Sequence, residues 1–271
     1  MESKDAVIRP ARSEDLVGVH AIATSFGLLE AWPGRPDFLD REHGTGRLVV
    51  ATVDTRVLAF AGALRRGELT HLGDLFVEPE HQSRGLGRRL LDPLLADASS
   101  MITFASADPR ALALYLRWGM RACGVLLYLT GSPRLGSPLR TAHLVRADRI
   151  AALDGLASGG DRADDLAWYE QLPGVAIHAS DHGYAVTRTV GDTVVVGPAG
   201  GQTTSDCVDA VAAAIATHDS PPSVRIAVPG IHPLARILLE SGMRIADCDT
   251  ILATDPDRIA FDRYLPHPDL G

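Results

Sequence analysis

A glycine-rich loop between a predicted strand and a predicted helix is the part of this sequence best suited to ligand chemistry. The strand covers residues 69–77, Pro79 follows it, and Gly85 and Gly87 stand just before the helix. Glycine lets a backbone approach a ligand closely, and the first turn of a helix presents free N–H groups backed by about +0.5 of dipole charge. These features predict an anion site suited to a pyrophosphate, although a tight structural turn would need the same glycines. The arginines beside the loop are Arg84, Arg88 and Arg89.

A second segment of the sequence helps to identify the kind of protein to which the loop belongs. The loop sequence Gln-Ser-Arg-Gly-Leu-Gly at 82–87 resembles the (Arg/Gln)-x-x-Gly-x-(Gly/Ala) motif of the GNAT superfamily, the acyl-CoA-dependent N-acetyltransferases. Residues 108–120, Asp-Pro-Arg-Ala-Leu-Ala-Leu-Tyr-Leu-Arg-Trp-Gly-Met, are similar in register to that family's Asn-x-x-Ala-x-x-Leu-Tyr-x-x-x-Gly-Phe segment. The motifs follow in the family's order with one predicted strand between them. Residues 5–130 are therefore identified as a member of this family.

The resemblance implies that acetyl-CoA is the co-substrate and that the loop binds its diphosphate. In the family a β-bulge splays the preceding strand from its neighbour, so that backbone groups pair with the pantetheine arm and one N–H polarises the thioester carbonyl. Asp108 replaces the family's usual asparagine and lacks its amide donor. The residues expected to contact the co-substrate are Leu75, Phe76, Val77, Gln82, Ser83, Arg84, Gly85, Leu86, Gly87, Arg88 and Asp108.

Acetyl transfer to an amine requires a neutral nucleophile and a proton for the departing thiolate. A lysine-like amine has a pKa of about 10.4, so only about one molecule in 10³ is neutral at pH 7. A base that removes the proton, directly or through water, would lower this barrier. The resemblance implies that Tyr115 protonates the CoA thiolate. For the base, Asp74 ranks slightly above His71, Glu78 comes third, and loss of the proton to water stays open.

The two leading base candidates, His71 and Asp74, match different related enzymes and would lie on opposite faces of a regular strand. His71 stands where some histone acetyltransferases have a glutamate and serotonin acetyltransferases a histidine. Asp74 matches an acidic position of the spermidine/spermine-type enzymes, whose neighbouring glutamate is Gly73 here. Since 71 and 74 differ by an odd number, a regular strand would point the two side chains to opposite faces. The family's bulge would change that parity.

The order of predicted elements indicates an α/β fold of the α+β type, with a mixed sheet. At 271 residues the chain suits two tandem GNAT-like domains: a complete one at 1–130, a linker at 131–140 and a shortened, degenerate one at 141–271. The first half is expected to contain a strand at 7–10, a helix capped by Ser13, a helix at 36–42, a hairpin at 47–64, the strand at 69–77, a helix to about 98, a strand at 101–106, a helix at 109–118 and a strand at 121–129. The second half is expected to contain a strand at 143–146, a helix at 149–156, a hairpin at 183–197, a helix at 206–218 capped by Ser205, a strand at 223–228, a helix at 232–241 and a strand at 247–254.

The second half resembles the C-terminal half of tandem GNAT proteins. Residues 238–243 echo residues 115–120, and the similarity also covers 153–154, 159–162 and 196–198. The stretch 197–205 stands where the first half has its glycine loop, but it lacks the motif and any basic residue. This half is therefore expected to bind no CoA and to act as a structural partner, with a wall of the acceptor pocket or a dimer contact as alternatives.

Composition excludes several functions. A net charge of −8 argues against nucleic-acid binding and weakly favours a cationic acceptor. No apolar run is long enough for a membrane span, and the N-terminus lacks a signal-peptide pattern, so a cytoplasmic location without membrane contact is expected. Cys123, Cys207 and Cys248 suggest reduced, mostly core thiols and no metal site. Lys4 is the single lysine among many arginines, a bias typical of a GC-rich bacterial genome.

The sequence as a whole predicts an N-acetyltransferase that moves an acetyl group from acetyl-CoA to a primary amine by direct attack in a ternary complex. The acceptor could be a small metabolite, an amine-bearing antibiotic, or a protein N-terminus or lysine, and a homodimer is left open. The alternatives are a catalytically silent CoA-binding sensor or scaffold, and an acyltransferase that uses a longer acyl-CoA.

Overall fold

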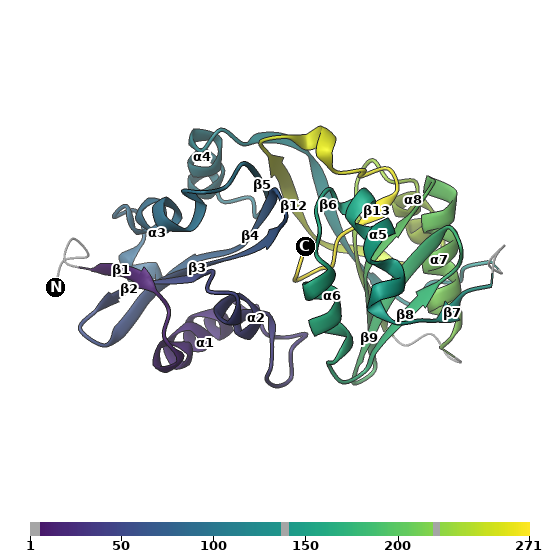
Figure 1. Ribbon diagram of the computed structural model, residues 1–271, viewed down its shortest axis with the longest axis horizontal. Coiled ribbons are helices and arrows are strands. Elements are labelled where there is room, and N and C mark those ends of the chain that lie inside the picture. Colours follow the sequence, from purple (N-terminus) through teal and green to yellow (C-terminus); the bar gives the residue numbers. More distant parts are fainter. Residues whose placement is uncertain (1–5, 137–140, 219–222) are drawn as a thin grey trace. The chain divides into compact units, whose positions relative to one another are not determined.

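The structure, a computed structural model, describes residues 6–136, 141–218 and 223–271 (Figure 1). The chain divides into two compact units, a first unit up to Met101 and a second unit from Ile102 onward. Each unit mixes helices and strands, so the mixed α/β fold predicted from the sequence is confirmed. Within the described ranges, no helix combines the length and apolarity needed to cross a membrane. The cytoplasmic location stays a prediction.

The described part of the first unit contains an antiparallel sheet in the strand order β1-β2-β3-β4. Its strands are β1 (Val7–Pro10), β2 (Leu48–Val53), β3 (Arg56–Arg66) and β4 (Leu69–Val77). Helices α1 (Leu16–Ser25) and α2 (Phe38–Gly44) lie on one side of this sheet, and α3 (Leu86–Leu95) lies on the other (Figure 1). The predicted hairpin and the predicted strand at 69–77 are confirmed, whereas α3 ends a few residues before the predicted position.

The start of α1 differs from the prediction that Ser13 caps it. A 3-10 turn, η2 (Ser13–Asp15), precedes the helix, and the buried Asp15 carboxylate accepts a hydrogen bond from the Arg12 N–H at 2.7 Å. Arg9 of β1 donates to the same carboxylate (Nη1–Oδ2 2.6 Å), and this hydrogen bond holds the pKa of Asp15 below its usual value. The Asp15 carboxylate, paired with Arg9, therefore organises the start of α1, where the prediction placed the Ser13 hydroxyl as the cap.

The described part of the second unit contains a mixed sheet in the strand order β5-β12-β6-β11-β10-β9-β8-β7. Its strands are β5 (Ser100–Ala105, in this unit from Ile102), β6 (Arg121–Gly131), β7 (His143–Leu144), β8 (Val175–Ala179), β9 (Gly183–Val190), β10 (Thr193–Gly201), β11 (Ser223–Pro229), β12 (Arg244–Ala253) and β13 (Tyr264–Leu265), which pairs with β10. Its helices are α4 (Pro109–Arg117), α5 (Ala147–Ser158), α6 (Ala163–Glu170), α7 (Thr204–Ala216), α8 (Leu234–Glu240) and the 3-10 turn η4 (Pro256–Arg258).

The last strands of the two predicted halves exchange places in this sheet. β12, which ends the second half, pairs antiparallel with β5 of the first half. β6, which ends the first half, pairs antiparallel with β11 of the second half, and β6 and β12 also pair with each other. The domain boundaries at 1–130, 131–140 and 141–271 stay a prediction. Residues 137–140 of the predicted linker lie outside the described residues.

Some local predictions for the second half are wrong. Thr203, and not Ser205, caps α7: its hydroxyl accepts from the Asp206 N–H at 3.2 Å while the Asp206 carboxylate accepts from the Thr203 N–H at 3.1 Å. Residues 197–201 extend β10 instead of forming a loop. Helix α6 and strand β8 have no counterpart among the predicted elements.

The cysteines also differ from expectation. Cys207 is buried on α7, but Cys123 on β6 and Cys248 on β12 are exposed, so the expectation of mostly core thiols is wrong. All three are free thiols. Strands β6 and β12 are the exchanged strands, and the first half of each is exposed.

A buried ion pair joins α5 to the segment before α6 in the second unit. The Arg162 guanidinium, with 3% of its side chain exposed, donates to the fully buried Asp154 carboxylate (Nε–Oδ2 2.6 Å) and to the Gly271 carbonyl (2.8 Å). The Tyr184 hydroxyl donates to the same carboxylate. Asp154 and Arg162 both belong to the stretch whose sequence is similar to tandem GNAT proteins.

Arg162→Leu is expected to destabilise the second unit by about 3–5 kcal/mol, because the substitution leaves the Asp154 carboxylate buried without its cation. Urea unfolding followed by circular dichroism measures the change. Arg236→Leu removes an exposed arginine from α8 and serves as the control. The double variant Asp154→Leu/Arg162→Leu should lose less than Arg162→Leu alone; an equal or larger loss would contradict the pairing.

Candidate functional site

The loop predicted to bind an anion folds back on the end of β4 and leads into α3. A 3-10 turn, η3 (Pro79–His81), follows the strand, and the Gln82 side-chain amide donates to the Val77 carbonyl at 3.1 Å. Ser83 and Gly85 have φ angles of 61° and 81°, in the left-handed region. Gly85 is the N-cap of α3, so the unsatisfied N–H groups of the first helical turn follow it directly. A turn of this kind at the positive end of a helix presents backbone donors to an anion.

The surroundings of the loop leave room for a ligand. A Cβ placed on Gly85 would have no heavy atom within 4 Å. The buried Leu86 anchors the start of α3, whereas Arg84 and Arg88 are exposed beside it. Arg89 is held elsewhere, because its Nη2 donates to the Ala6 carbonyl at 2.6 Å. The loop thus fits a diphosphate, with Arg84 and Arg88 as the nearby cations.

Strand β4 contains the β-bulge that the resemblance implied. Its pairing with β3 shifts by one residue at Gly73. On either side of the bulge, Asp74 pairs with Gly62 and His71 pairs with Leu64. Because positions 62 and 64 lie on one face of β3, their partners also share one face. The bulge therefore brings the two leading base candidates to the same face in spite of their odd spacing.

The base candidates are buried beside an exposed glycine. His71 and Asp74 are 4% and 6% exposed, whereas Gly73 between them is exposed. The residues expected to pair with the pantetheine arm, Leu75 to Val77, are half-buried and continue the pairing with β3 up to the end of the strand. Which residue is the general base stays a prediction.

A further ionisable side chain, which the sequence reading did not select, reaches this face from α2. Glu42 is 2% exposed. A Cβ on Gly62 would lie 1.6 Å from Glu42 Oε2, so the carboxylate lies directly over that glycine. A Cβ on Gly73 would lie 3.0 Å from Glu42 Oε1 and 3.9 Å from His71 Cε1. Little in the sequence indicated Glu42 as a site residue. Both glycines lie beneath its carboxylate because of the strand register at the bulge, which is a property of the folded sheet.

The N-terminus of α2 is fixed by a separate group of side chains. The ligand atoms of His20, Asp37 and Asp40 lie within 4.8 Å of one another, which is close enough to consider a metal ion. Each is already engaged: Asp37 Oδ1 accepts from the Leu39 N–H at 3.0 Å, Asp37 Oδ2 lies 2.8 Å from His20 Nε2, and Asp40 pairs with Arg35. This group caps α2 and ties it to α1, and thereby holds the helix that carries Glu42.

Asp108 and Tyr115 belong to α4, in the second unit. Asp108 caps this helix by accepting from the Arg110 N–H at 2.8 Å. Its carboxylate also accepts from the Arg110 guanidinium (Nη2–Oδ2 2.7 Å), and this hydrogen bond keeps the pKa of Asp108 below its usual value. Tyr115 is 6% exposed. The roles of Asp108 in co-substrate binding and of Tyr115 as an acid stay predictions.

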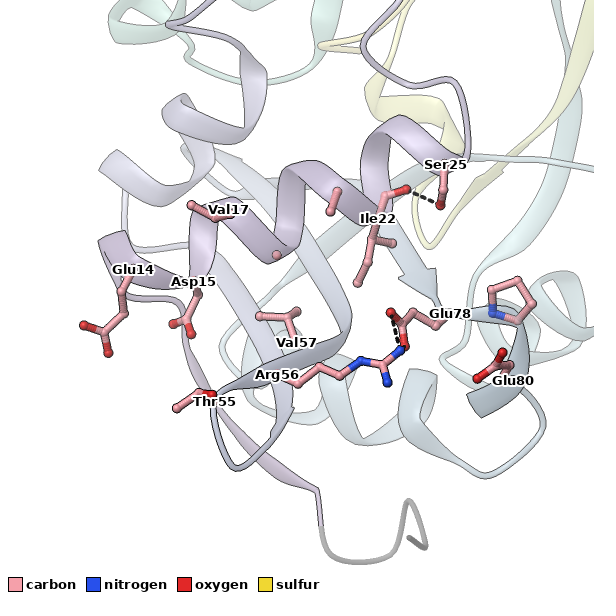
Figure 2. A pocket seen from close by; sticks show the side chains of 13 residues that line it. Glu14, Asp15, Val17, Ile22, Ser25, Thr55, Arg56, Val57, Glu78 and Glu80 are labelled. Atoms are coloured by element: carbon pink, nitrogen blue, oxygen red, sulfur yellow. Dashed lines mark hydrogen bonds and ion pairs between the residues drawn. The ribbon is translucent and has the colours of Figure 1, made fainter.

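A cavity of about 630 Å³ lies in the first unit between α1, the start of β3 and η3 (Figure 2). Carboxylates from Glu14, Asp15, Glu78 and Glu80 line it, together with apolar groups that include Val57. Glu78, the third base candidate, is paired with Arg56 (Oε2–Nη2 2.8 Å). His71, Asp74 and the loop at 82–88 do not line this cavity. Glu78 therefore lines a cavity that the other two candidates do not line.

Comparisons with known proteins agree with this architecture. Residues 17–120 match the model of the acetyltransferase (GNAT) family. No curated protein matches the chain. Among solved structures, the chain is similar to a candidate acetyltransferase from Pyrococcus horikoshii, at 13% identity and a TM-score of 0.75 over 99% of this chain and 96% of that one. It is also similar to GCN5-related N-acetyltransferases from Kribbella flavida (16% identity, TM-score 0.60, 92% and 71% covered) and Sphaerobacter thermophilus (14%, 0.59, 93% and 96%). At these identities the structural likeness shows the fold.

Gly85→Glu is expected to weaken acetyl-CoA binding by about 100-fold or more, because a carboxylate would occupy the space over the loop and repel the diphosphate. Isothermal titration calorimetry measures the affinity, and circular dichroism checks that the variant is folded. The matched control is Gly46→Glu, which also places a glutamate at a positive φ with no heavy atom within 4 Å. Retained affinity in folded Gly85→Glu would show that the loop does not bind the co-substrate.

Proposed function

We propose that the protein moves an acetyl group from acetyl-CoA to a primary amine, on the basis that residues 17–120 match the model of the acetyltransferase (GNAT) family. The amine attacks the thioester directly in a ternary complex, without a covalent enzyme intermediate. The acceptor is a small molecule or a peptide amine.

The observation that carries this proposal is the geometry of the loop between β4 and α3. Left-handed backbone at Ser83 and Gly85, open space over Gly85 and the first turn of α3 together suit a diphosphate. Acetyl-CoA contains a diphosphate, and its thioester supplies the activated acetyl group. The remaining chemistry, which is to position the amine and to move protons, falls to side chains of this protein.

The bulged strand supports a role in removing the amine proton. His71 and Asp74 share one buried face, with the exposed Gly73 between them in the sequence. A base held within hydrogen-bond reach of an amine, or connected to it by one water, contributes typically 10²–10⁴-fold to the rate. We expect one of these two residues to be that base, and Glu78 to be a weaker candidate because its carboxylate is paired with Arg56.

The departing thiolate needs a proton, and we expect Tyr115 to supply it. A phenol with an ordinary pKa near 10 can donate to a thiolate of pKa about 8.5 once water is excluded. The support for this role is the register of the segment 108–120, together with the burial of Tyr115 on α4.

The second candidate function is a CoA-binding protein that no longer turns over. Asp108 favours it, because the carboxylate that replaces the family's asparagine is occupied by the N-cap of α4 and by Arg110. An acyltransferase that uses a longer acyl-CoA is a further alternative, since the loop suits the diphosphate and leaves the acyl group unspecified.

A thiol-release assay with acetyl-, propionyl- and succinyl-CoA separates these functions. Purified protein is incubated with each donor and a panel of small amines and peptides. We expect CoA release to be fastest with acetyl-CoA and to require an amine. Binding of acetyl-CoA without thiol release over the whole panel would favour the silent protein, and faster release from a larger donor would favour the longer acyl group.

Tyr115→Phe is expected to lower kcat by about 10²-fold with little change in acetyl-CoA affinity, because the hydroxyl serves the leaving group only during the reaction. Steady-state kinetics and calorimetry on the same preparation measure the two effects. An unchanged kcat in the variant would refute the acid role of Tyr115.

A further inference from the structure

We propose that Glu42 is a positioning residue for proton transfer: its carboxylate orients His71 and stabilises the imidazolium that forms when His71 takes the proton of the acceptor amine. This inference rests on the proposed function and deepens it, since it selects His71 from the two candidates and adds a residue from α2.

The first support is the place of the Glu42 carboxylate. It lies over Gly62 of β3 and beside Gly73 of β4, where the missing side chains leave space for it. A Cβ at position 62 would overlap it at 1.6 Å, so the two glycines form a cradle that a larger residue would fill. The Glu42 backbone is fixed as well, because its carbonyl accepts from the Arg47 N–H at 2.9 Å and from the Thr45 hydroxyl at 2.9 Å.

The second support is the direction of the His71 side chain. The bulge places His71 on the face of the sheet that α2 covers, the same face on which Glu42 lies over Gly62. His71 Cε1 and Glu42 Oε1 are both close to the position that a Cβ on Gly73 would occupy, at 3.9 Å and 3.0 Å. The imidazole and the carboxylate therefore both border the same point over the bulge.

The third support is the charge of the groups on this face. Among the described residues of the first unit, Glu42 from α2, Asp74 from β4 and Arg66 from β3 are placed on this face with His71, and all are less than a tenth exposed. Helix α1 contributes His20, which is bonded to Asp37 at the other end of α2. With a neutral imidazole, the two carboxylates exceed the single guanidinium by one charge. Protonation of His71 balances the group, so a buried site of this composition favours the imidazolium.

The fourth support is access. Gly73 is exposed although its neighbours His71 and Asp74 are buried. In this proposal the amine approaches the imidazole at this exposed position of the strand. In the step itself, an N–H bond of the acceptor ammonium breaks as a new N–H bond forms on His71, and the freed electron pair forms the C–N bond to the acetyl carbon. The C–S bond of the thioester breaks, and the departing thiolate is protonated by the general acid, which regains a proton from the nitrogen of the new amide. His71 later releases its proton to water.

The direct test is the titration of His71 followed by NMR of the imidazole ¹H and ¹³C signals, assigned by their loss in His71→Asn. In the wild-type protein we expect the His71 midpoint to lie above the ordinary histidine value of about 6.5. In Glu42→Gln, which keeps the size and removes the charge, we expect the midpoint to fall by about one pH unit or more. Glu240→Gln on α8, an exposed residue, is the control and should leave the midpoint unchanged.

A wild-type midpoint at or below 6.5 would overturn the proposal without any variant. An unchanged midpoint in folded Glu42→Gln would overturn it as well. If Glu42→Gln does not fold, the wild-type titration still decides. If the protein transfers no acyl group, the proposed function fails, whereas the NMR titration continues to test the pairing of Glu42 with His71.

Steady-state kinetics of Glu42→Gln then test whether the pairing of Glu42 with His71 serves the reaction. In Glu42→Gln we expect kcat to fall about 10- to 100-fold while the KM for acetyl-CoA changes less than about twofold, because the loop at 82–88 is untouched. The rising limb of the kcat/KM–pH profile, which reports the free enzyme, should move to lower pH by the shift that NMR measures. A lower kcat with an unmoved profile would indicate a merely structural role and contradict the proposal.

Discussion

One extra residue in β4 is the constraint on which the candidate site depends. Gly73 shifts the register of β4 against β3, and this shift brings His71 and Asp74 to one face of the sheet. Because Gly73 and its neighbour Gly62 lack side chains, the Glu42 carboxylate lies against the backbone there. The spermidine/spermine-type enzymes have a glutamate where this chain has Gly73, and here the space beside that position holds a carboxylate from a helix.

The ability of the loop after β4 to bind an anion depends more on its backbone geometry than on charged side chains. Left-handed φ angles at Ser83 and Gly85 turn the chain into α3, and the Gln82 side chain fixes the loop to the end of the strand. Donors of the first helical turn follow at once. Of the arginines that flank the loop in the sequence, Arg89 is bonded to Ala6, so backbone donors with Arg84 and Arg88 are the groups offered to an anion.

The second unit is held together by pairings that join its two ends. β12 lies between β5 and β6, and β6 lies between β12 and β11, so the final strand of each predicted half pairs with a strand of the other half. The buried pair of Asp154 and Arg162 adds a charged contact that reaches Gly271. Residues 197–201, part of the stretch predicted to stand in place of the glycine loop, belong to strand β10.

The sequence by itself determined the motifs and most of the elements, α6 and β8 excepted, because these depend on local properties: hydrophobic periodicity, turn residues and glycine spacing. It predicted β4, the loop and α3 closely, and it placed Asp74 and His71 on the strand beside the loop. Only the tertiary structure decided the exchange of β6 and β12, the caps at Asp15 and Thr203, and the position of Glu42 over the bulge. The physical reason is that each of these rests on packing or pairing between side chains and strands whose relative register no local pattern encodes.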